Sequence, residues 1–369
     1  MNNPFKNFIK QQDTNVIGID IGSSAIKIVQ LAKVKGKAIL KTYGSLALGP
    51  YVGLSPGQAT NISQDRLSAV ILDLMKEANV NTSNTGVSIP IRSSLVTLVE
   101  MPDLPEKELA TMIPIEARKY IPVPISEVAL DWWIIPKEES KAFDFEPKKE
   151  VAVSQKTEVL VVSIHNEVLN NYSEIVKRAS LKTTFFEIEM FASIRSLIDR
   201  ELAPVMIFDM GAGSTKLYIV ERGIIRRSHI INRGSQDITI SISQGLQVPL
   251  EKAEKIKRNL GANSEADEKT VYDIIDLTLD YIFSEAGAVM LGYEKRYGKT
   301  LSKIFLTGGG VALKGFLKYA KSRFQTEVVL GDPFSKVETP AFLTDILKQS
   351  GLDFSVAVGI ALRKLQEFD

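Results

Sequence analysis

The chain has 369 residues, a length that exceeds one small domain and suits two domains of about 150 to 200 residues each. Hydrophobic residues make up 44% of it and charged residues 24%, which excludes disorder over most of its length, and a formal net charge of +1 excludes a general attraction to nucleic acid or anionic lipid. The absence of cysteine excludes disulfides, thiolate metal sites and a cysteine nucleophile, and it fits a reducing compartment.

Residues 1–13 form an N-terminal tail without the long apolar core of a secretory signal, and no later run reaches the ~18 consecutive apolar residues of a membrane helix. We therefore expect a cytoplasmic chain. Phe5, Phe8 and Ile9 fall at helical spacing beside two lysines, and this pattern fits either a weak interfacial anchor or a tail that docks on the body of the protein.

The first domain is predicted to begin with three strands and a helix over residues 14–84. The runs 15–21, 25–33 and 37–48 are rich in β-branched residues and are separated by GSS and KGK turns, which predicts an antiparallel meander. The segment QDRLSAVILDLMKEANV places its apolar residues at helical spacing. It is therefore expected to form a helix that packs on the sheet.

Residues 85–155 interrupt this rhythm and are predicted to form an inserted small α+β subdomain. It would contain the strands TGVSIPI and SLVTLVEM, a helix that begins with Pro105 and Glu106, and the strand EVALDWWIIP. The run 137–156 is charged and has neither helical nor strand periodicity, which indicates a mobile surface loop.

Residues 156–200 are predicted to return to the first domain as an alternation of strands and helices, which is typical of an α/β layer. The first of these strands, TEVLVVSIH, is apolar enough to be buried on both faces. The C-terminal helix, within residues 353–369, is expected to pack on the same domain and to complete its core.

The opening pattern restarts near Pro204 with a strand, a glycine turn, a strand, a two-residue turn and a third strand. Asp209 in this second copy lies 189 positions after Asp20 in the first. The repeat predicts a second domain of the same kind over residues 201–352. A long helical stretch at about 235–300 would form a lobe on it.

Each copy carries an aspartate at the end of its first strand, followed by small residues that leave backbone N–H groups uncovered. Such a turn can receive phosphate, although a strand that ends in Asp and Gly is also an ordinary hairpin turn. Two facing carboxylates would repel each other and a triphosphate unless a divalent cation lies between them, so Asp20 and Asp209 are predicted to hold Mg²⁺, mainly through water. The turn residues are Asp20, Gly22, Ser23 and Ser24 in the first copy and Asp209, Gly211, Gly213, Ser214 and Thr215 in the second.

A third turn, Gly308, Gly309 and Gly310, ends a strand and precedes the helix KGFLKYAKSRF. Glycines at this place let a nucleotide lie against the backbone, whereas the same turn taken alone is an ordinary connection between a strand and a helix. Three such turns in this order favour a nucleotide cleft between the two domains.

The ordered set GIDIGSSAIKIVQL, FDMGAGSTKLYIV and FLTGGGVALKGF resembles the two phosphate motifs and the adenosine motif of the actin, Hsp70 and sugar kinase superfamily. This resemblance covers essentially the whole chain. It implies an actin-like (ribonuclease H-like) α/β fold of duplicated domains with mixed sheets, and ATP with Mg²⁺ in the cleft between them.

The resemblance also implies roles for four further residues. Glu189 in IEMFASIRSL would be catalytic, with Asp20 and Asp209, by positioning the attacking water, although a carboxylate at a helix N-terminus is also favoured by the helix dipole. Glu254 and Lys257 in LEKAEKIKRNLG would contact ribose and adenine, or else form a solvated helical pair. Lys27 would neutralise phosphate, or else point outward from its strand.

Within the superfamily the chain resembles the PilM family of type IV pilus machines, on VIGIDIGSSAIKIVQL and EARKYIPVPISEVALDWWII. The related division protein FtsA shares the insertion but normally ends in an amphipathic membrane helix. Residues 364–369 directly follow the expected core helix, so we do not expect such an anchor here. The PilM resemblance implies a cytoplasmic scaffold bound to ATP, peripheral to the inner membrane through partner proteins, with ATP hydrolysis slow or incidental.

The partner implied by this resemblance is the N-terminal cytoplasmic peptide of a PilN-like inner-membrane protein, with self-association possible and no role for nucleic acid. Residues 116–120 and 130–133 are the candidates for the groove wall; otherwise Trp132 and Trp133 simply alternate across a strand. Two other functions remain open, an ATP-dependent small-molecule kinase and an FtsA-like polymerising protein, and substrate-stimulated ADP release or ATP-dependent sedimentation would reveal them.

Overall fold

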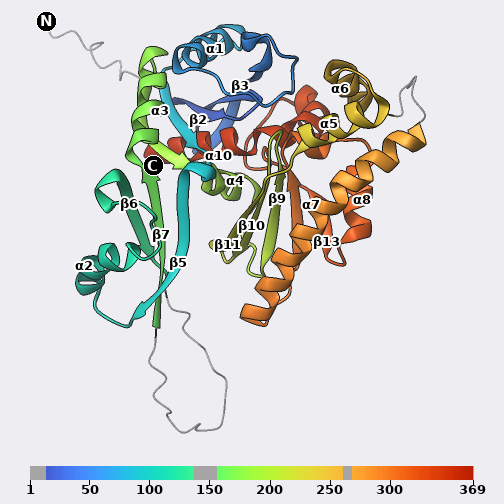
Figure 1. Ribbon diagram of the computed structural model, residues 1–369. Coiled ribbons are helices and arrows are strands. Elements are labelled where there is room, and N and C mark those ends of the chain that lie inside the picture. The colour runs from blue at the N-terminus through green and yellow to red at the C-terminus, as the bar shows by residue number, and fades with distance from the viewer. Residues whose placement is uncertain (1–13, 137–155, 261–267, 369) are drawn as a thin grey trace, which may run out of the picture.

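The computed structural model describes residues 14–136, 156–260 and 268–368. Two five-stranded sheets and one three-stranded sheet carry the fold, and helices lie between and outside them (Figure 1). The tail 1–13 and all but the last residue of the charged run 137–156 lie outside the described residues, so the predicted anchor or docked tail and the predicted mobile loop stay predictions.

The first sheet has the strand order β3-β2-β1-β4-β8. Its first three strands form the predicted antiparallel meander, and β4 and β8 then add in parallel. β1 is an apolar run that is buried along almost its whole length, as a central strand requires. The strands are β1 (Asn15–Ile21), β2 (Ala25–Val34), β3 (Lys37–Ala47), β4 (Asn84–Ile89) and β8 (Lys182–Ile188).

The second sheet repeats this order as β11-β10-β9-β12-β13, with an antiparallel meander followed by parallel strands. The predicted duplication is therefore confirmed at the level of strand order. Both meanders turn between their second and third strands through two residues of positive φ, Lys35–Gly36 and Arg222–Gly223. The strands are β9 (Val205–Met210), β10 (Thr215–Glu221), β11 (Ile224–Ile231), β12 (Lys303–Thr307) and β13 (Glu327–Leu330).

The third sheet, with the order β5-β7-β6, belongs to the inserted subdomain. It is antiparallel, and the helix α2 (Glu106–Ala117) packs on one of its faces. Its other face joins the apolar cluster that covers β9, β10 and β11 of the second sheet. The strands are β5 (Ser94–Pro102), β6 (Val128–Ile134) and β7 (Lys156–His165).

The predicted membership of two strands was wrong. β4 was expected in the insertion, but it pairs with β1 and β8 of the first sheet, and β7 was expected in the first domain, but it is the central strand of the third sheet. Burial and alternation identify a strand, yet they do not reveal its neighbours. The insertion's sheet therefore starts at Ser94, nine residues after the predicted start at residue 85, and runs on to His165, beyond the predicted limit of residue 155.

Two helices, α4 (Glu189–Leu197) and α10 (Ser355–Leu365), lie against each other between the first and second sheets. α10 fits there because glycines remove side chains at the contacts. A Cβ on Gly18 of β1 would overlap the Ala357 carbonyl of α10, and a Cβ on Gly359 of α10 would overlap the Ala192 carbonyl of α4. The predicted return of the C-terminal helix to the first domain is thus confirmed.

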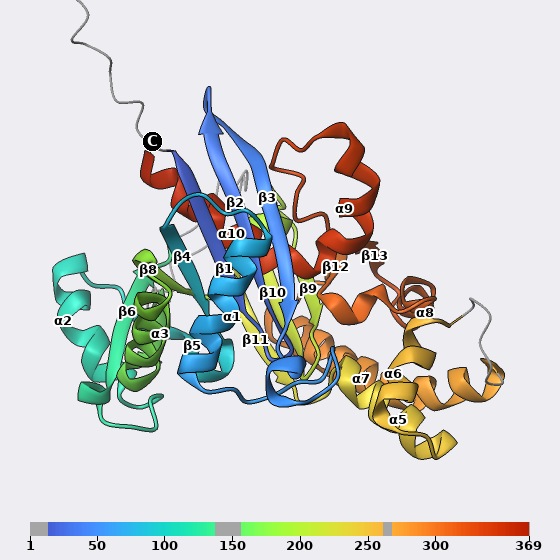
Figure 2. The same cartoon turned by 90° about the horizontal axis from the view of Figure 1, so that it is seen from above.

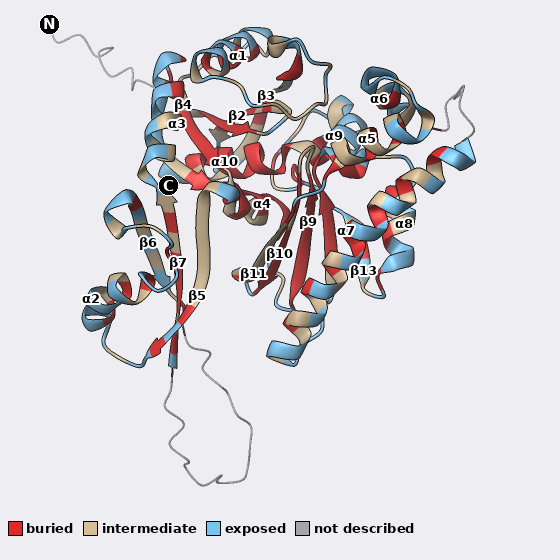
Figure 3. Cartoon of the chain, viewed as in Figure 1, coloured by how far each residue is buried: buried red, intermediate tan, exposed pale blue. Residues whose placement is uncertain are grey.

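The outer faces of the large sheets are covered by the remaining long helices (Figures 2 and 3). α1 (Gln64–Glu77) and α3 (Asn166–Arg178) cover the first sheet. The predicted helical lobe is present on the second, where α7 buries residues at intervals of three or four along one stripe. The other helices are α5 (Ser235–Leu246), α6 (Leu250–Arg258), α7 (Glu268–Tyr297), α8 (Phe316–Arg323) and α9 (Thr344–Ser350).

Within the described residues, no helix combines the length and the hydropathy that crossing a bilayer requires.

Candidate functional site

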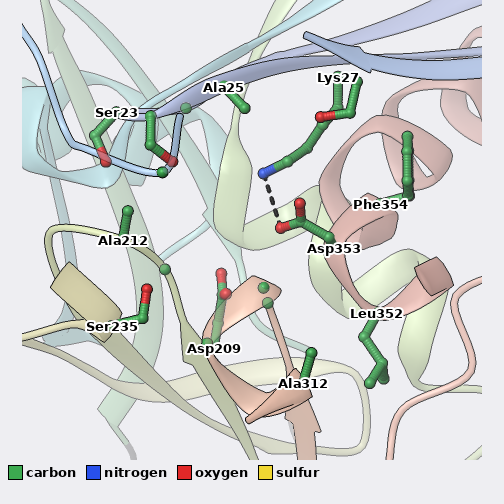
Figure 4. A pocket seen from close by; sticks show the side chains of 18 of the residues that line it. Ser23, Ala25, Lys27, Asp209, Ala212, Ser235, Ala312, Leu352, Asp353 and Phe354 are labelled. Atoms are coloured by element: carbon green, nitrogen blue, oxygen red, sulfur yellow. Dashed lines mark ion pairs between the residues drawn. The ribbon is translucent and has the colours of Figure 1, made fainter. Parts of the chain in front are cut away.

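A cavity of about 650 Å³ joins the three glycine turns predicted from the sequence. This volume lies within the range of about 300 to 1,000 Å³ that is common for small-molecule sites. Figure 4 shows Ser23 and Lys27 on one side of the cavity and Asp209, Ala212 and Ala312 on another. The predicted site residues that line it are Asp20, Gly22, Ser23, Ser24, Lys27, Glu189, Asp209, Gly211, Ser214, Glu254, Lys257, Gly308, Gly309 and Gly310.

The strand pairing places an acid and a lysine side by side in each half. Asp20 of β1 is the partner of Lys27 of β2, and Asp209 of β9 is the partner of Lys216 of β10. Cross-strand neighbours lie on the same face of a sheet, so both pairs face the cavity. Lys216 was missed in the sequence, although the 189-residue offset that relates the two aspartates also relates Lys27 to it.

The backbone of the second half comes close to the cavity at Gly308, where φ is 87°. A Cβ there would overlap the Asp209 carboxylate, so glycine is needed for both conformation and space. The first and second turns also approach each other, because a Cβ on Gly213 would lie 3.6 Å from the Ser23 hydroxyl. The two Asp-containing turns therefore lie close together, and their joint binding of polyphosphate stays a prediction.

In the first half, Lys27 lies between two carboxylates. Its Nζ is 2.9 Å from Oδ1 of Asp353 and 3.7 Å from Oδ2 of Asp20, and Ser88 donates a hydrogen bond to Oδ1 of Asp20 at 3.0 Å. Burial acts to lower the pKa of Lys27, but the attraction of Asp353 and then of Asp20 outweighs it, so the net pKa lies above its ordinary value. The reading of Lys27 as an outward-facing lysine was wrong, because its side chain is buried against the cavity.

In the second half, Lys216 Nζ is 2.5 Å from Oε2 of Glu189 and 4.0 Å from Oδ2 of Asp209. Burial raises the pKa of Asp209 to about 6, against the opposing attraction of Lys216. Burial acts to lower the pKa of Lys216, but the attraction of Glu189 and then of Asp209 outweighs it, so the net pKa lies above its ordinary value. Burial therefore disfavours the ionised form of Asp209, and a bound cation would stabilise that form.

Glu189, at the start of α4, is 6% exposed and has both carboxylate oxygens engaged. Oε2 faces Lys216, and Oε1 accepts a hydrogen bond from the backbone N–H of Ile91 at 2.9 Å. Ile91 begins the short 3₁₀ turn η2 (Ile91–Ser93), from which β5 enters the insertion. Glu189 thus connects the cavity to the root of the third sheet.

The two predicted α6 residues face the cavity and not the solvent. The side chains of Glu254 and Lys257 are 13% and 11% exposed and form an ion pair of 2.7 Å. Thr239 of α5 donates a hydrogen bond to Glu254 and accepts one from Lys257, at 2.6 and 2.8 Å. The alternative of a solvated pair was therefore wrong.

Two predicted residues do not line the cavity. Thr215 is fully buried and donates its hydroxyl hydrogen bond to the carbonyl of Arg233 at 2.9 Å, because side chains alternate along β10 and Ser214 and Lys216 take the cavity side. Gly213 lies next to Ser23 at the rim but is not part of the wall.

Asp353 was missed as well, and no local pattern pointed to it. It belongs to the turn η6 (Gly351–Phe354) before α10, more than 320 residues from its partner Lys27. Figure 4 shows the ion pair that joins these two side chains across the cavity. Only the return of the C-terminal helix between the sheets brings this carboxylate to the first turn.

Of the residues predicted as a groove wall, 130–133 lie on β6 of the third sheet, and 116–120 lie at the C-terminal end of α2 and directly after it. β6 pairs with β7 on one side only, so it is an edge strand among the described residues. Trp132 packs partly buried against the cluster under α2, whereas Trp133 is 50% exposed. The two tryptophans alternate across the strand as expected.

The donor set fits hydrated Mg²⁺ and a triphosphate better than a directly coordinated metal. Among the described residues no group of three or more His, Cys, Asp or Glu side chains could hold a metal ion directly. Asp20 and Asp209 instead offer one carboxylate from each half, and the glycine turns and two lysines offer N–H and cationic groups suited to phosphate. When bound, Mg²⁺ would neutralise phosphate charge between these carboxylates.

A family model described as type IV pilus assembly protein PilM matches residues 18–365. The cell division protein FtsA of Neisseria meningitidis is 25% identical, over 92% of this chain and 90% of the relative. Among solved structures, a PilM-PilN type IV pilus biogenesis complex superposes with a TM-score of 0.78 at 22% identity, over 95% of this chain and 98% of the other. MreB5 of Spiroplasma citri bound to AMPPNP gives 0.50 at 12% identity, over 96% and 97%. The predicted actin-like fold is confirmed by these likenesses.

Proposed function

The chain belongs to the PilM family of type IV pilus assembly proteins, and from this premise we propose that it is an ATP-dependent adaptor of the pilus assembly complex. It holds Mg-ATP in the cavity between its halves and binds the N-terminal peptide of a PilN-like inner-membrane protein on its insertion. It acts in the cytoplasm and reaches the inner membrane through that partner. The observation that carries the proposal is the cavity itself, into which an acid and a lysine project from each half.

The charges of the cavity support ATP as the ligand. The N–H groups of the two Asp-containing turns and the lysines Lys27 and Lys216 are suited to phosphate. Glu254 and Lys257 on α6 line the same cavity, and we propose that they contact ribose and adenine. Asp20 and Asp209 hold Mg²⁺ mainly through its water. The glycines at 308–310 leave the backbone open to the nucleoside.

Slow hydrolysis suits the state of Glu189. A residue that orients an attacking water needs a free acceptor within hydrogen-bond reach of that water. Each oxygen of Glu189 already accepts from one donor, the Lys216 ammonium or the Ile91 amide, which leaves fewer acceptor positions for a water. We therefore propose that the protein retains ATP as a structural ligand and that turnover is incidental to its role.

The insertion supports a peptide partner. Among the described residues β6 is an edge strand, so its outer backbone groups can pair with one extended strand, and Trp133 on β6 offers an exposed aromatic surface. The C-terminal end of α2 and the following residues, 116–120, present the half-exposed Tyr120 as a second side-chain contact. A PilN-like peptide on this edge would gain main-chain hydrogen bonds from β6 and specificity from these side chains.

Peptide titration with and without Mg-ATP tests the function. If both ligands prefer the same arrangement of the halves, each raises the affinity for the other by the same factor, typically about 5- to 150-fold. Trp133→Ala should lower the affinity for the peptide by about tenfold or more. Phe342→Ala, which removes a more exposed aromatic side chain outside the insertion, should leave that affinity unchanged. Equal peptide affinities with and without ATP would remove the nucleotide from the proposal.

A further inference from the structure

The two cavity lysines occupy equivalent positions but have different partners. Lys27 and Lys216 each lie opposite the aspartate of their own hairpin. The nearest carboxylate to Lys27 is Asp353, on the segment that leads into α10, whereas the nearest to Lys216 is Glu189. The two lysines therefore occupy matching strand positions, but their nearest carboxylates come from different segments, the turn before α10 and the start of α4.

Glu189 also holds the point where the chain leaves the first domain for the insertion. Its Oε1 accepts the Ile91 N–H, and Ile91 is buried in the cluster that packs the third sheet on the second. Ion pairs thus join Asp209 to Lys216 and Lys216 to Glu189, in a row that leads from the cavity to the insertion. A change in the position of the Lys216 ammonium would alter the charge balance of Glu189 directly.

A second buried donor, Tyr218, packs in the same cluster as Ile188 and Met190, which flank Glu189 in the chain. Tyr218 follows Lys216 by two positions in β10, so both side chains lie on one face of the strand. Its hydroxyl is fully buried and has no hydrogen-bond partner among the described residues. Burial, followed by the Glu189 and Asp209 carboxylates, raises the pKa of Tyr218 well above its ordinary value, so the hydroxyl keeps its proton for donation. A buried hydroxyl without a partner is unfavourable, which favours any state in which it finds an acceptor.

We infer that Lys216 is a positioning residue with two partners, Glu189 in the structure described here and the terminal phosphate when a nucleoside triphosphate is bound. In the second state Glu189 gives up its contact with Lys216 and accepts a hydrogen bond from the Tyr218 hydroxyl. The carboxylate that holds the Ile91 amide is then re-aimed, and the root of the third sheet responds to the nucleotide. This inference rests on the proposed function, because it names the residues that couple ATP to the insertion.

Hydrogen exchange of the backbone amides of residues 91–102, with and without Mg-ATP, tests the inference, together with nucleotide affinity measured by calorimetry. In the unaltered protein, Mg-ATP should change the exchange rate at this segment several-fold. Lys216→Met should lower ATP affinity about tenfold and abolish that change at saturating ATP. Lys27→Met is the matched control, since it should lower ATP affinity by a similar factor and keep the change.

Glu189→Gln provides the sharper arm, because the amide oxygen can still accept the Ile91 N–H while Lys216 loses its competing carboxylate. ATP affinity should then rise several-fold while the exchange response is lost, so Glu189→Gln and Lys216→Met move affinity in opposite directions. Lys216→Arg should restore the response if Lys216→Met folds poorly. A residue that only stabilises the fold would not give these opposite shifts.

The outcomes separate the inference from the proposed function. If the unaltered protein does not bind ATP, the proposed function fails. If it binds ATP but residues 91–102 do not respond, or if Lys216→Met keeps the response, only the inference is overturned. A fall in affinity in Glu189→Gln would overturn it as well.

Discussion

The two halves of the molecule show how far a duplication extends. Both have a five-stranded sheet with the same order and direction of strands, the same two-residue turn in the meander, and an aspartate and a lysine paired at the same place. The residues that follow the fourth strand differ. In the first half β4 continues into Pro90 and the insertion, whereas in the second half β12 ends at Thr307 and Gly308. The two Asp-containing turns are thus shared, but after the fourth strand the second half has the glycine turn that we propose for the nucleoside, where the first half has Pro90.

The helices that complete the two halves differ in the same way. α10 packs on the first sheet so closely that position 18 must be glycine, while the position 189 residues later in β9 is Ile207, a core residue under the insertion. α7 covers the second sheet through large side chains in a stripe. Close helix contact is therefore a property of the centre of the molecule, and looser coverage is a property of its outer surface.

The largest expected effect concerns this difference in packing. Gly359→Ala in α10 should destabilise the protein by about 3 kcal/mol or more, because the new methyl group overlaps the backbone of Ala192. Gly287→Ala in α7 has open space around the new methyl group and should stabilise by about 0.5 to 1 kcal/mol, the usual gain for alanine in a helix. Chemical denaturation measures both. Similar effects of the two substitutions would contradict the contrast between the helices.

The second prediction compares the paired aspartates. Asp209→Asn should lower Mg-ATP affinity about 100-fold, since it removes one of the two carboxylates predicted to hold the hydrated cation. Asp20→Asn should also lower affinity, but only Asp209→Asn should stabilise the nucleotide-free protein, because burial already disfavours the charge on Asp209. Calorimetry and thermal unfolding of each variant test this. Unchanged Mg-ATP affinity in Asp209→Asn would show that the metal site is misassigned.

The third prediction is the pH dependence of that stabilisation. The pKa of Asp209 is about 6 in the folded chain, against 3.8 as its ordinary value. Below pH about 4 the group is protonated in both states and contributes no difference. As pH rises to 6 the folded state must give up a proton it holds more tightly, so stability falls by about 2 to 3 kcal/mol and stays constant above. The stability difference between the unaltered protein and Asp209→Asn should follow this course, and a difference that is flat from pH 4 to 7 would refute it.

The smallest effect concerns α6 of the second half. Lys257→Ala should lower ATP affinity several-fold, because this side chain lies in the cavity wall. Lys255→Ala, two positions earlier, removes an exposed lysine that pairs with Glu251 at 2.7 Å, and it should leave affinity unchanged and stability within about 0.5 kcal/mol. Nucleotide titration of both variants tests whether the second half alone recognises the nucleoside.

The sequence determined those parts of the fold that depend on local pattern. Apolar runs and turn residues predicted the two meanders, the helical lobe and the C-terminal helix, and the 189-residue offset predicted the paired aspartates. The same offset relates Lys27 to Lys216, which was not predicted. Strand alternation could also have removed Thr215 from the site, because it lies between Ser214 and Lys216, which both line the cavity.

Only the tertiary structure decided which strands pair and which charges meet. β4 and β7 have the same apolar character, yet one joins the first sheet and the other the insertion, since strand pairing depends on contacts distant in the sequence. Asp353 reaches Lys27 because α10 returns between the sheets. Glu189 meets Lys216 because α4 packs on the second sheet. A sequence pattern states what each segment can form, but the partner of a buried charge is set by the packing of segments that lie far apart along the chain.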